Sequence, residues 1–313
     1  MISSGISVVL ASFNGSRHIA GQLASLTEQS VLPTELLVGD DGSDDDTLEK
    51  VRAFADTGLF TVKITPPQNR PLGPCNNFSR LLEMAEGEYI LLCDQDDVWL
   101  PDKIEVTLAE MRRVEGDFGC RTPCLVHTDL QVTTEDGTVI APSFWNYQRY
   151  APSTTAQLHG VLAQSAVTGC TVMLNRALAD VVCPIPSAGP LMHDWWLALV
   201  VNAIGGQVRY LIKPTVRYRQ HSGNIVGARS WKRLVYERSA APGAWRSQFN
   251  DTCRQAAALL ERHSADIDPQ NLNALEEYAA LPSQSFWDRR RVLWRHGIRK
   301  SGWYRTAGMY FFA

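Results

Sequence analysis

An apolar stretch that ends in a cluster of carboxylates decides the fold: residues 91–99 read LLCDQDDVW. Residues 89–93 have the length and apolar content of a strand that is buried on both faces. Three carboxylates follow within four residues, Asp94, Asp96 and Asp97. They require a counter-charge, which Mg2+ or Mn2+ would supply while leaving positions open for substrate phosphates. The alternative is a solvated acidic turn before a helix, with Asp97 or Asp102 as its N-cap.

The composition describes an ordinary globular protein without a strong charge. The chain has 313 residues, an apolar fraction of 45% and a net charge of -3, which argues against nucleic acid as the principal partner. Seven cysteines without regular spacing argue against a disulfide framework. We see neither a signal-peptide pattern nor an apolar run near the length of about 20 residues that spans a bilayer. The sequence therefore predicts a cytoplasmic protein that handles a small polar or charged ligand.

The region around the acidic stretch alternates strand and helix. Strands are predicted at residues 6–11, 35–39, 61–64 and 89–93, with apolar residues at helical spacing between them. This alternation predicts a parallel, doubly wound sheet, whose ligands bind at the carboxyl ends of the strands. The first two strands end in the sequences SFNG and DDGS. The chain contains neither G-x-G-x-x-G after the first strand nor the phosphate-binding G-x-x-x-x-G-K-S/T, so dinucleotide and P-loop functions lose their main support.

The motifs, in this order, resemble those of family 2 inverting glycosyltransferases with the GT-A fold. They are SFNG at 12–15, DDGS at 40–43, then Asn69, Gly73 and Asn77, and finally DQDDVW at 94–99. The DQDD-x-W form is most similar to bacterial rhamnosyltransferase-like members that build surface polysaccharides such as O-antigen. The resemblance covers residues 5–225. It implies an α/β domain at 1–228 with a Rossmann-like, mostly parallel sheet. From residue 230 onward the sequence predicts helices without strand signals, which gives a helical C-terminal appendage at 229–313.

The resemblance also implies a donor site and a metal site. Asp96, with Asp94, matches the D-x-D pair that binds the metal, and His221 is a candidate third ligand, although a lone histidine in a loop is more often a surface residue. The nucleotide-sugar donor would be held by Ser12, Asn14, Asp40, Asp41, Asn69, Arg70, Asn77, Asp97 and Arg219. Turn and cap chemistry is an equally good explanation for Asn69 and Asn77. Asp97 would hold the donor sugar or cap the next helix.

The acceptor side would come from the second half of the domain. An inverting transfer needs one carboxylate that takes a proton from the acceptor hydroxyl, and Asp194 matches the family's base at the start of a helix. A plain helix N-cap is the alternative for Asp194. Residues 166–174 are predicted as an acceptor-facing strand with Gly169 and Cys170 at its centre, although Cys170 also fits a small buried residue. One of Trp195 and Trp196 would line the acceptor or donor wall, because both cannot easily face inward.

The C-terminal stretch combines basic and aromatic residues. Residues 286–313 contain seven basic residues and one acidic residue, interleaved with tryptophan, tyrosine and phenylalanine. This pattern is typical of a helix on an anionic membrane surface, here the inner face of the cytoplasmic membrane. A packing or homodimer helix with a solvated basic face is the alternative.

Together these features predict a metal-dependent inverting glycosyltransferase. The resemblance implies dTDP-L-rhamnose as donor and a saccharide or an undecaprenyl-diphosphate-linked glycan as acceptor. One alternative is a sugar-1-phosphate nucleotidyltransferase, but the Gly-rich basic loop after the first strand is missing from SFNG. The other is a non-catalytic scaffold that binds a nucleotide sugar without turnover.

Overall fold

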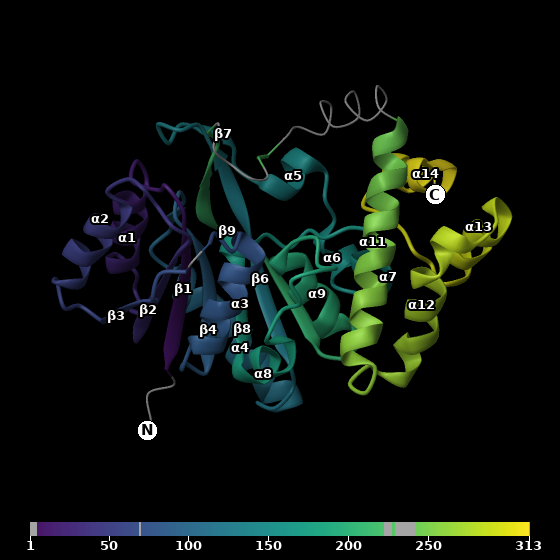
Figure 1. The fold of residues 1–313 in the computed structure, drawn as a ribbon, viewed down its shortest axis with the longest axis horizontal. Helices are drawn as coiled ribbons and strands as arrows, with labels where there is room; N and C mark the ends of the chain where they lie inside the picture. Colours follow the sequence, from purple (N-terminus) through teal and green to yellow (C-terminus); the bar gives the residue numbers. More distant parts are fainter. Residues whose placement is uncertain (1–4, 69, 222–226, 229–241, 313) are drawn as a thin grey trace.

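A mixed sheet forms the centre of the molecule (Figure 1). The computed structural model describes residues 5–68, 70–221, 227–228 and 242–312. The strand order is β3-β2-β1-β4-β8-β6-β9-β5, and β7 pairs with β6. The strands are β1 (Ile6–Ser12), β2 (Glu35–Asp40), β3 (Thr61–Ile64), β4 (Tyr89–Asp94), β5 (Val98–Trp99), β6 (Cys124–Thr133), β7 (Val139–Ala141), β8 (Met173–Asn175) and β9 (Gln207–Arg219).

Helices cover both faces of this sheet, and the C-terminal helices lie at one end of the molecule (Figure 1). Those of the first part are α1 (Ile19–Thr27), α2 (Thr47–Ala55), α3 (Pro74–Met84), α4 (Lys103–Phe118), α5 (Phe144–Gln148), α6 (Pro152–Thr155), α7 (Leu158–Val161), α8 (Arg176–Val182) and α9 (His193–Ala203). The C-terminal region contains α11 (Pro242–His263), α12 (Pro269–Ala279), α13 (Phe286–Arg295) and α14 (Trp303–Phe312). In the described part of the chain, no helix has the length and apolar character that crossing a bilayer requires.

The predicted strand–helix alternation of the first half is confirmed. The strands β1 to β4 begin at the predicted residues, and three of them extend one residue further than predicted. They are parallel, with β1 between β2 and β4. The register pairs Ser12 with Asp40 and Ala11 with Asp94. The loops that follow β1, β2 and β4 therefore meet at one edge of the sheet, where parallel sheets bind ligands.

The second half brings distant residues to the same edge. The strand β8 is antiparallel to β4 and β6, and β9 is parallel to β6. The short strand β5, which directly follows the acidic cluster, pairs Val98 with Arg217 of β9. This pairing places the end of β9, with Arg219 and then His221, beside the acidic cluster, although more than a hundred residues separate them in sequence.

The continuous strand predicted for residues 166–174 is wrong. The chain forms a 3-10 turn at Gly169–Thr171, and a strand of three residues, β8, follows it. Backbone bonds from Thr171 N–H to the Thr168 carbonyl and from Val172 N–H to the Gly169 carbonyl close the turn. An apolar run of this length is compatible with either structure, and the turn bends the chain toward the start of α9.

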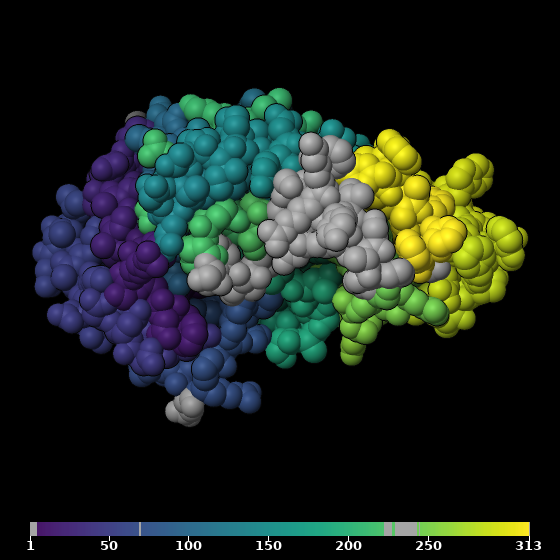
Figure 2. All heavy atoms as spheres, turned by 90° about the horizontal axis from the view of Figure 1, so that it is seen from above, coloured from purple at the N-terminus to yellow at the C-terminus, as the bar shows by residue number. Residues whose placement is uncertain are grey.

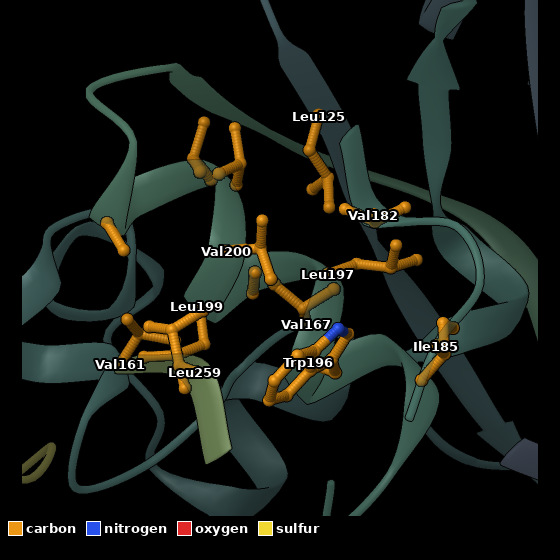
Figure 3. Packing of buried hydrophobic residues seen from close by; sticks show 14 of the residues in the cluster. Leu125, Val161, Val167, Val182, Ile185, Trp196, Leu197, Leu199, Val200 and Leu259 are labelled. Atoms are coloured by element: carbon orange, nitrogen blue, oxygen red, sulfur yellow. The ribbon is translucent and has the colours of Figure 1, made fainter. Parts of the chain in front are cut away.

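One hydrophobic cluster joins α9 to the sheet and to the C-terminal helices. Trp196 has no solvent exposure and lies among Val167, Ile185 and Leu197 (Figure 3). The same cluster contains Leu259 of α11. The predicted boundary near residue 228 stays a prediction, because residues 229–241 lie outside the described part, but the helices beyond it share this core.

Candidate active site

The loops after β1 and β2 are held together by the acids predicted to bind the nucleotide. Asp40 accepts hydrogen bonds from the Ser12 hydroxyl (2.9 Å), the Ser43 hydroxyl (2.6 Å) and the Ser43 N–H (2.8 Å). Asp41 accepts from the backbone N–H groups of Leu72 (2.5 Å) and Gly73 (2.8 Å), directly before α3. Each of these two residues is 8% exposed. Both therefore shape this edge of the sheet, and their contact with a base or ribose stays a prediction.

A second set of contacts fixes the β1–α1 loop. The Asn14 side-chain oxygen accepts from the Asp44 N–H at 3.0 Å, and Asn14 itself adopts a left-handed φ of 47°. Gln95, the second residue of DQDD, donates to the Phe13 carbonyl and accepts from the Phe13 N–H, both at 2.9 Å. A Cβ on Gly15 would lie 2.1 Å from the Gln95 side-chain oxygen, so a larger residue there would displace the Gln95 amide from Phe13. The acidic loop is thus clamped to the loop predicted to contact the donor.

The three carboxylates of DQDD have different surroundings. Asp94 ends β4, and burial together with the carboxylates of Asp96 and Asp194 raises its pKa to about 7. Asp96 is paired with His221, with 2.8 Å between Oδ2 and Nε2. Asp97 has no exposed surface, and burial, followed by the charges of Asp96 and Asp94, raises its pKa well above the usual range. Full negative charge on all three carboxylates at once is therefore unfavourable without an added cation.

The geometry differs from the predicted ligand set. The ligand atoms of Asp94, Asp97 and Cys170 lie within 4.8 Å of one another, whereas Asp94, Asp96 and His221 are not gathered this closely. Burial raises the pKa of the Cys170 thiol well above its usual value, so the sulfur keeps its proton and is a poor ligand for a hard cation. Asp94 and Asp96 are less buried than Asp97, and their role as metal ligands stays a prediction.

Lys103 lies beneath this cluster and was missed by the sequence reasoning. Its side chain is fully buried, with the ammonium 4.5 Å from the centre of the Trp99 ring. Burial lowers the pKa of Lys103 to about 8, while Cys170, Cys93 and Asp97 oppose that shift. No local pattern predicts this burial, because a lysine at the start of a helix ordinarily lies on the surface.

A histidine pair connects the acidic cluster to the β1–α1 loop. The rings of His18 and His221 lie 4.7 Å apart, and Arg219 Nη1 lies 3.1 Å from His18 Nδ1. Glu135, at the β6–β7 turn, lies 3.4 Å from His18 Nε2. His18 therefore supports both predicted residues, His221 and Arg219. It was not predicted, because nothing local distinguishes it and its partners are far away in sequence.

Asp194 lies at the start of α9 and faces the cluster. Its Oδ2 accepts from the Gly169 N–H at 2.9 Å, and its Oδ1 accepts from the Trp195 N–H at 2.6 Å. The helix N-cap is Met192, so the simple N-cap interpretation of Asp194 is wrong. His193 next to it is buried and stacks on Phe78, with ring centres 4.1 Å apart. Asp194 is thus held rigidly while its remaining lone pairs can accept a proton.

Four predicted contact residues are too buried to contact a substrate directly. Asp97, Cys170 and Trp196 have no exposed surface, and Asn77 is 2% exposed. Asn77 donates to the Gly39 carbonyl at 2.7 Å and so fixes α3 to β2. The direct substrate contacts predicted for Asp97, Cys170 and Asn77 are therefore wrong, because packing from distant elements covers them. Of the two tryptophans, Trp196 is the buried one, so the predicted wall position falls to Trp195.

The other predicted residues have different environments. Arg70 is exposed, and Asn69 lies outside the described residues. Trp195 is partly buried, and its indole N–H donates to the Val161 carbonyl at 2.7 Å. Gly169 was predicted to let the backbone approach a ligand, but the structure places it in close contact with His193 and Asp194 at the start of α9. For Arg70 and Trp195 the predicted substrate contacts stay predictions.

Gly169→Ala should displace Asp194, the predicted base. An added Cβ would lie 2.7 Å from His193 Nε2, and the stacked, buried imidazole has little room to move. We expect the start of α9 to shift, a loss of about 1–3 kcal/mol in unfolding free energy, and a fall of about tenfold or more in sugar transfer. Thermal melting and single-turnover transfer measure both effects.

Gly116→Ala is the matched control for this substitution. A Cβ at Gly116, inside α4, would meet nothing within 4 Å. Alanine favours a helix over glycine by about 1 kcal/mol, so this variant should be as stable as the wild type or more so, with unchanged transfer. If Gly169→Ala behaves in the same way, the close fit of the turn against His193 is unimportant for the site.

Comparison with known proteins identifies the class of enzyme. Residues 7–179 match the family described as "Glycosyl transferase family 2". The dTDP-rhamnosyl transferase RfbG of Shigella flexneri is 27% identical over 73% of this chain and 77% of that protein. The Escherichia coli protein WfgD, a UDP-Glc:alpha-D-GlcNAc-diphosphoundecaprenol beta-1,3-glucosyltransferase, is 26% identical over 63% of this chain and 69% of its own length. The mannosyltransferase PcManGT from Pyrobaculum calidifontis, solved with GDP-Man and Mn2+, superposes with a TM-score of 0.56 at 19% identity, over 93% of this chain and 73% of that one.

The fold and the site therefore define a glycosyltransferase of the GT-A type that uses a nucleotide-sugar donor. The family match covers more than half of the chain. The protein belongs to glycosyl transferase family 2, as the sequence motifs predicted.

Proposed function

We propose that the protein is a metal-dependent, inverting enzyme that transfers rhamnose from dTDP-L-rhamnose during the synthesis of a bacterial surface polysaccharide. The acceptor would be a glycan, free or linked to undecaprenyl diphosphate, at the inner face of the cytoplasmic membrane. The resemblance to the Shigella flexneri rhamnosyl transferase supports the donor, and the acceptor named for the Escherichia coli relative supports the lipid-linked glycan.

One observation carries this proposal: Asp194 faces the acids at the end of β4. Its charge contributes to the raised pKa of Asp94, so the two carboxylates interact although they come from β4 and α9. Asp94 can thus face the donor diphosphate while Asp194 faces the acceptor hydroxyl. This is the arrangement that a direct displacement at the anomeric carbon needs.

Asp194 would act as the general base. The hydroxyl oxygen of the acceptor attacks the anomeric carbon from the side opposite the diphosphate, and its proton passes to the Asp194 carboxylate. The bond to the diphosphate breaks, and the configuration inverts, so that a β-linked donor gives an α-linked product. The N–H groups of Gly169 and Trp195 hold the carboxylate in place for this transfer.

The residues at the end of β4 fit a divalent cation. Asp94 and Asp96 supply hard oxygen ligands, His221 lies next to Asp96, and the raised pKa of Asp94 reflects crowded negative charge that a cation would relieve. Bound there, Mg2+ or Mn2+ would balance the charge that develops on the departing diphosphate. The Mn2+ in the solved structure of the mannosyltransferase supports this choice.

The two alternative functions, a nucleotidyltransferase and a non-catalytic scaffold, agree less well with these observations. A nucleotidyltransferase would release pyrophosphate, whereas the family transfers the sugar itself. A non-catalytic scaffold would have no use for a carboxylate that two backbone donors hold against the acidic cluster. Release of a nucleoside diphosphate separates sugar transfer from both.

Donor hydrolysis tests the proposal directly. Purified protein with Mn2+ is incubated with dTDP-, UDP- and GDP-sugars, with and without lipid-linked saccharide acceptors, and the released nucleoside diphosphate is measured. We expect release of dTDP from dTDP-L-rhamnose that stops when a chelator removes the metal. Release from another donor would contradict the rhamnose assignment, and donor binding without release from any donor, even with acceptors, would contradict the catalytic proposal.

A further inference from the structure

The C-terminal helices expose large aromatic side chains to an unusual degree. Trp287, Trp294 and Trp303 are 74%, 78% and 83% exposed, whereas the other tryptophans of the described residues are buried or partly buried. Phe286 and Phe311 are also exposed. We name these five residues the C-terminal aromatic face. Exposed tryptophan is costly in water, so a surface that gathers three of them indicates a binding partner.

These rings come from the two last helices, α13 and α14, which are connected to each other. Trp287 and Trp294 are seven residues apart in α13 and share a helix face, while the buried Leu293 points toward the core. The Arg290 guanidinium donates to the carbonyls of Phe286 (2.6 Å) and Phe311 (3.0 Å), which connects α13 to α14. Figure 2 shows the C-terminal segment projecting at the end opposite the N-terminal part of the sheet.

The charge of this region is opposite to that of the whole chain. Residues 286–312 carry seven basic residues and one acidic residue, although the net charge of the protein is -3. Two of the basic residues serve the fold: Arg305 is buried and donates to backbone carbonyls of residues 148 and 149, and Lys300 is 7% exposed. The exposed Arg291 and Arg295 flank the tryptophans of α13.

A hollow beside Trp303 adds to the basic character of this surface. Its lining includes Arg299, Lys300, Trp303 and Tyr310. The exposed Arg299 can interact with a phosphate while the neighbouring rings contact apolar chains.

Two exposed arginines of α13 are held in ion pairs: Arg291 pairs with Asp288 and Arg295 with Glu277, both at 2.8 Å. At such exposed positions, ion pairs are weak and can exchange for other anions.

We propose that the C-terminal aromatic face binds the surface of an anionic phospholipid bilayer. Tryptophan rings favour the interface between headgroups and acyl chains, and arginines bind lipid phosphates. A symmetric homodimer through this face would place the same basic residues against each other, which is unfavourable. The charge therefore favours a lipid surface over a second copy of the chain. This inference concerns a different part of the molecule from the transfer site and is tested without any sugar nucleotide.

Vesicle binding by the full chain tests this proposal. Phosphatidylcholine vesicles with phosphatidylglycerol are compared with vesicles of phosphatidylcholine alone, by co-sedimentation and by the blue shift of tryptophan fluorescence. We expect binding to the anionic vesicles that weakens as salt is raised. The triple variant W287A/W294A/W303A should lower the affinity about 30-fold or more, and R291Q and R299Q about fivefold each.

Phe118→Ala, at an aromatic of α4 that is 49% exposed and lies outside the C-terminal helices, is the control and should bind like the wild type. The thermal stability of all variants should be unchanged, because the replaced side chains are exposed. Absence of binding to anionic vesicles would overturn the proposal, as would equal binding to both vesicle types. A dimer in solution that the triple variant dissociates, without vesicle binding, would assign the face to a second copy of the chain instead.

Discussion

Asp194→Asn is expected to lower the rate of sugar transfer by about 100-fold or more while leaving donor affinity nearly unchanged. The amide is close in shape to the carboxylate but cannot accept the proton of the acceptor hydroxyl. Its oxygen can still accept one of the two backbone bonds, from Gly169 or Trp195, so α9 should keep its position. Single-turnover transfer and donor titration measure the two quantities separately.

Asp268→Asn is the matched control for this variant. Asp268 is the N-cap of α12 and accepts from the Gln270 N–H at 2.9 Å, so it too holds the start of a helix, but it lies outside the acidic cluster. Asparagine is an equally good cap, and transfer should be unchanged. Near-normal transfer by Asp194→Asn would show that another group takes the proton and that Asp194 is structural.

Asp96→Ala is expected to remove the metal dependence of the enzyme. The substitution deletes a carboxylate of the proposed metal site and leaves His221 without its 2.8 Å partner. We expect Mn2+ affinity to fall by about 100-fold and donor hydrolysis to fall at least as much, because the charge on the departing diphosphate is no longer balanced. Calorimetric titration of Mn2+ and the release of nucleoside diphosphate provide the measurements.

Asp44→Ala, which changes an exposed acid in the β2–α2 loop, provides the control and should bind Mn2+ like the wild type.

The affinity of the wild-type protein for Mn2+ should also depend on pH. Because the pKa of Asp94 is raised to about 7, this carboxyl holds a proton below that pH, and a cation must displace it. Mn2+ affinity should therefore weaken as the pH falls through this pKa. If the Asp96→Ala variant bound Mn2+ with wild-type affinity, the metal site would not be at the D-x-D pair.

The sequence was a good guide to the first half of the fold. The strands β1, β2 and β4 are apolar runs that end in polar residues, and such a run is a local signal. The same runs place Asp40 and Asp94 at the ends of β2 and β4. Since parallel strands bring their carboxyl ends together, the sequence also predicted that Asp40 and Asp94 lie at the same edge of the sheet.

The second half was harder to predict. The antiparallel strand β8 has only three residues, and the 3-10 turn before it looks like a continuation of the strand in sequence. Its shape depends on contact between Gly169 and α9, which the local sequence does not contain. The same holds for His18, whose neighbours His221, Arg219 and Glu135 come from distant parts of the chain.

The sequence by itself determined the class of protein, the alternating elements of the first half and the positions of Asp94, Asp96 and Asp194, because strand ends and motif spacing are properties of the chain. Only the tertiary structure decided which of the polar side chains are exposed enough to contact a substrate. It buries Asp97 and Asn77 and leaves Asp96 beside His221. It also exposes three tryptophans of the C-terminal helices, which the sequence could equally have assigned to packing. Burial is set by elements that pack from far away in the chain, and no local pattern records it.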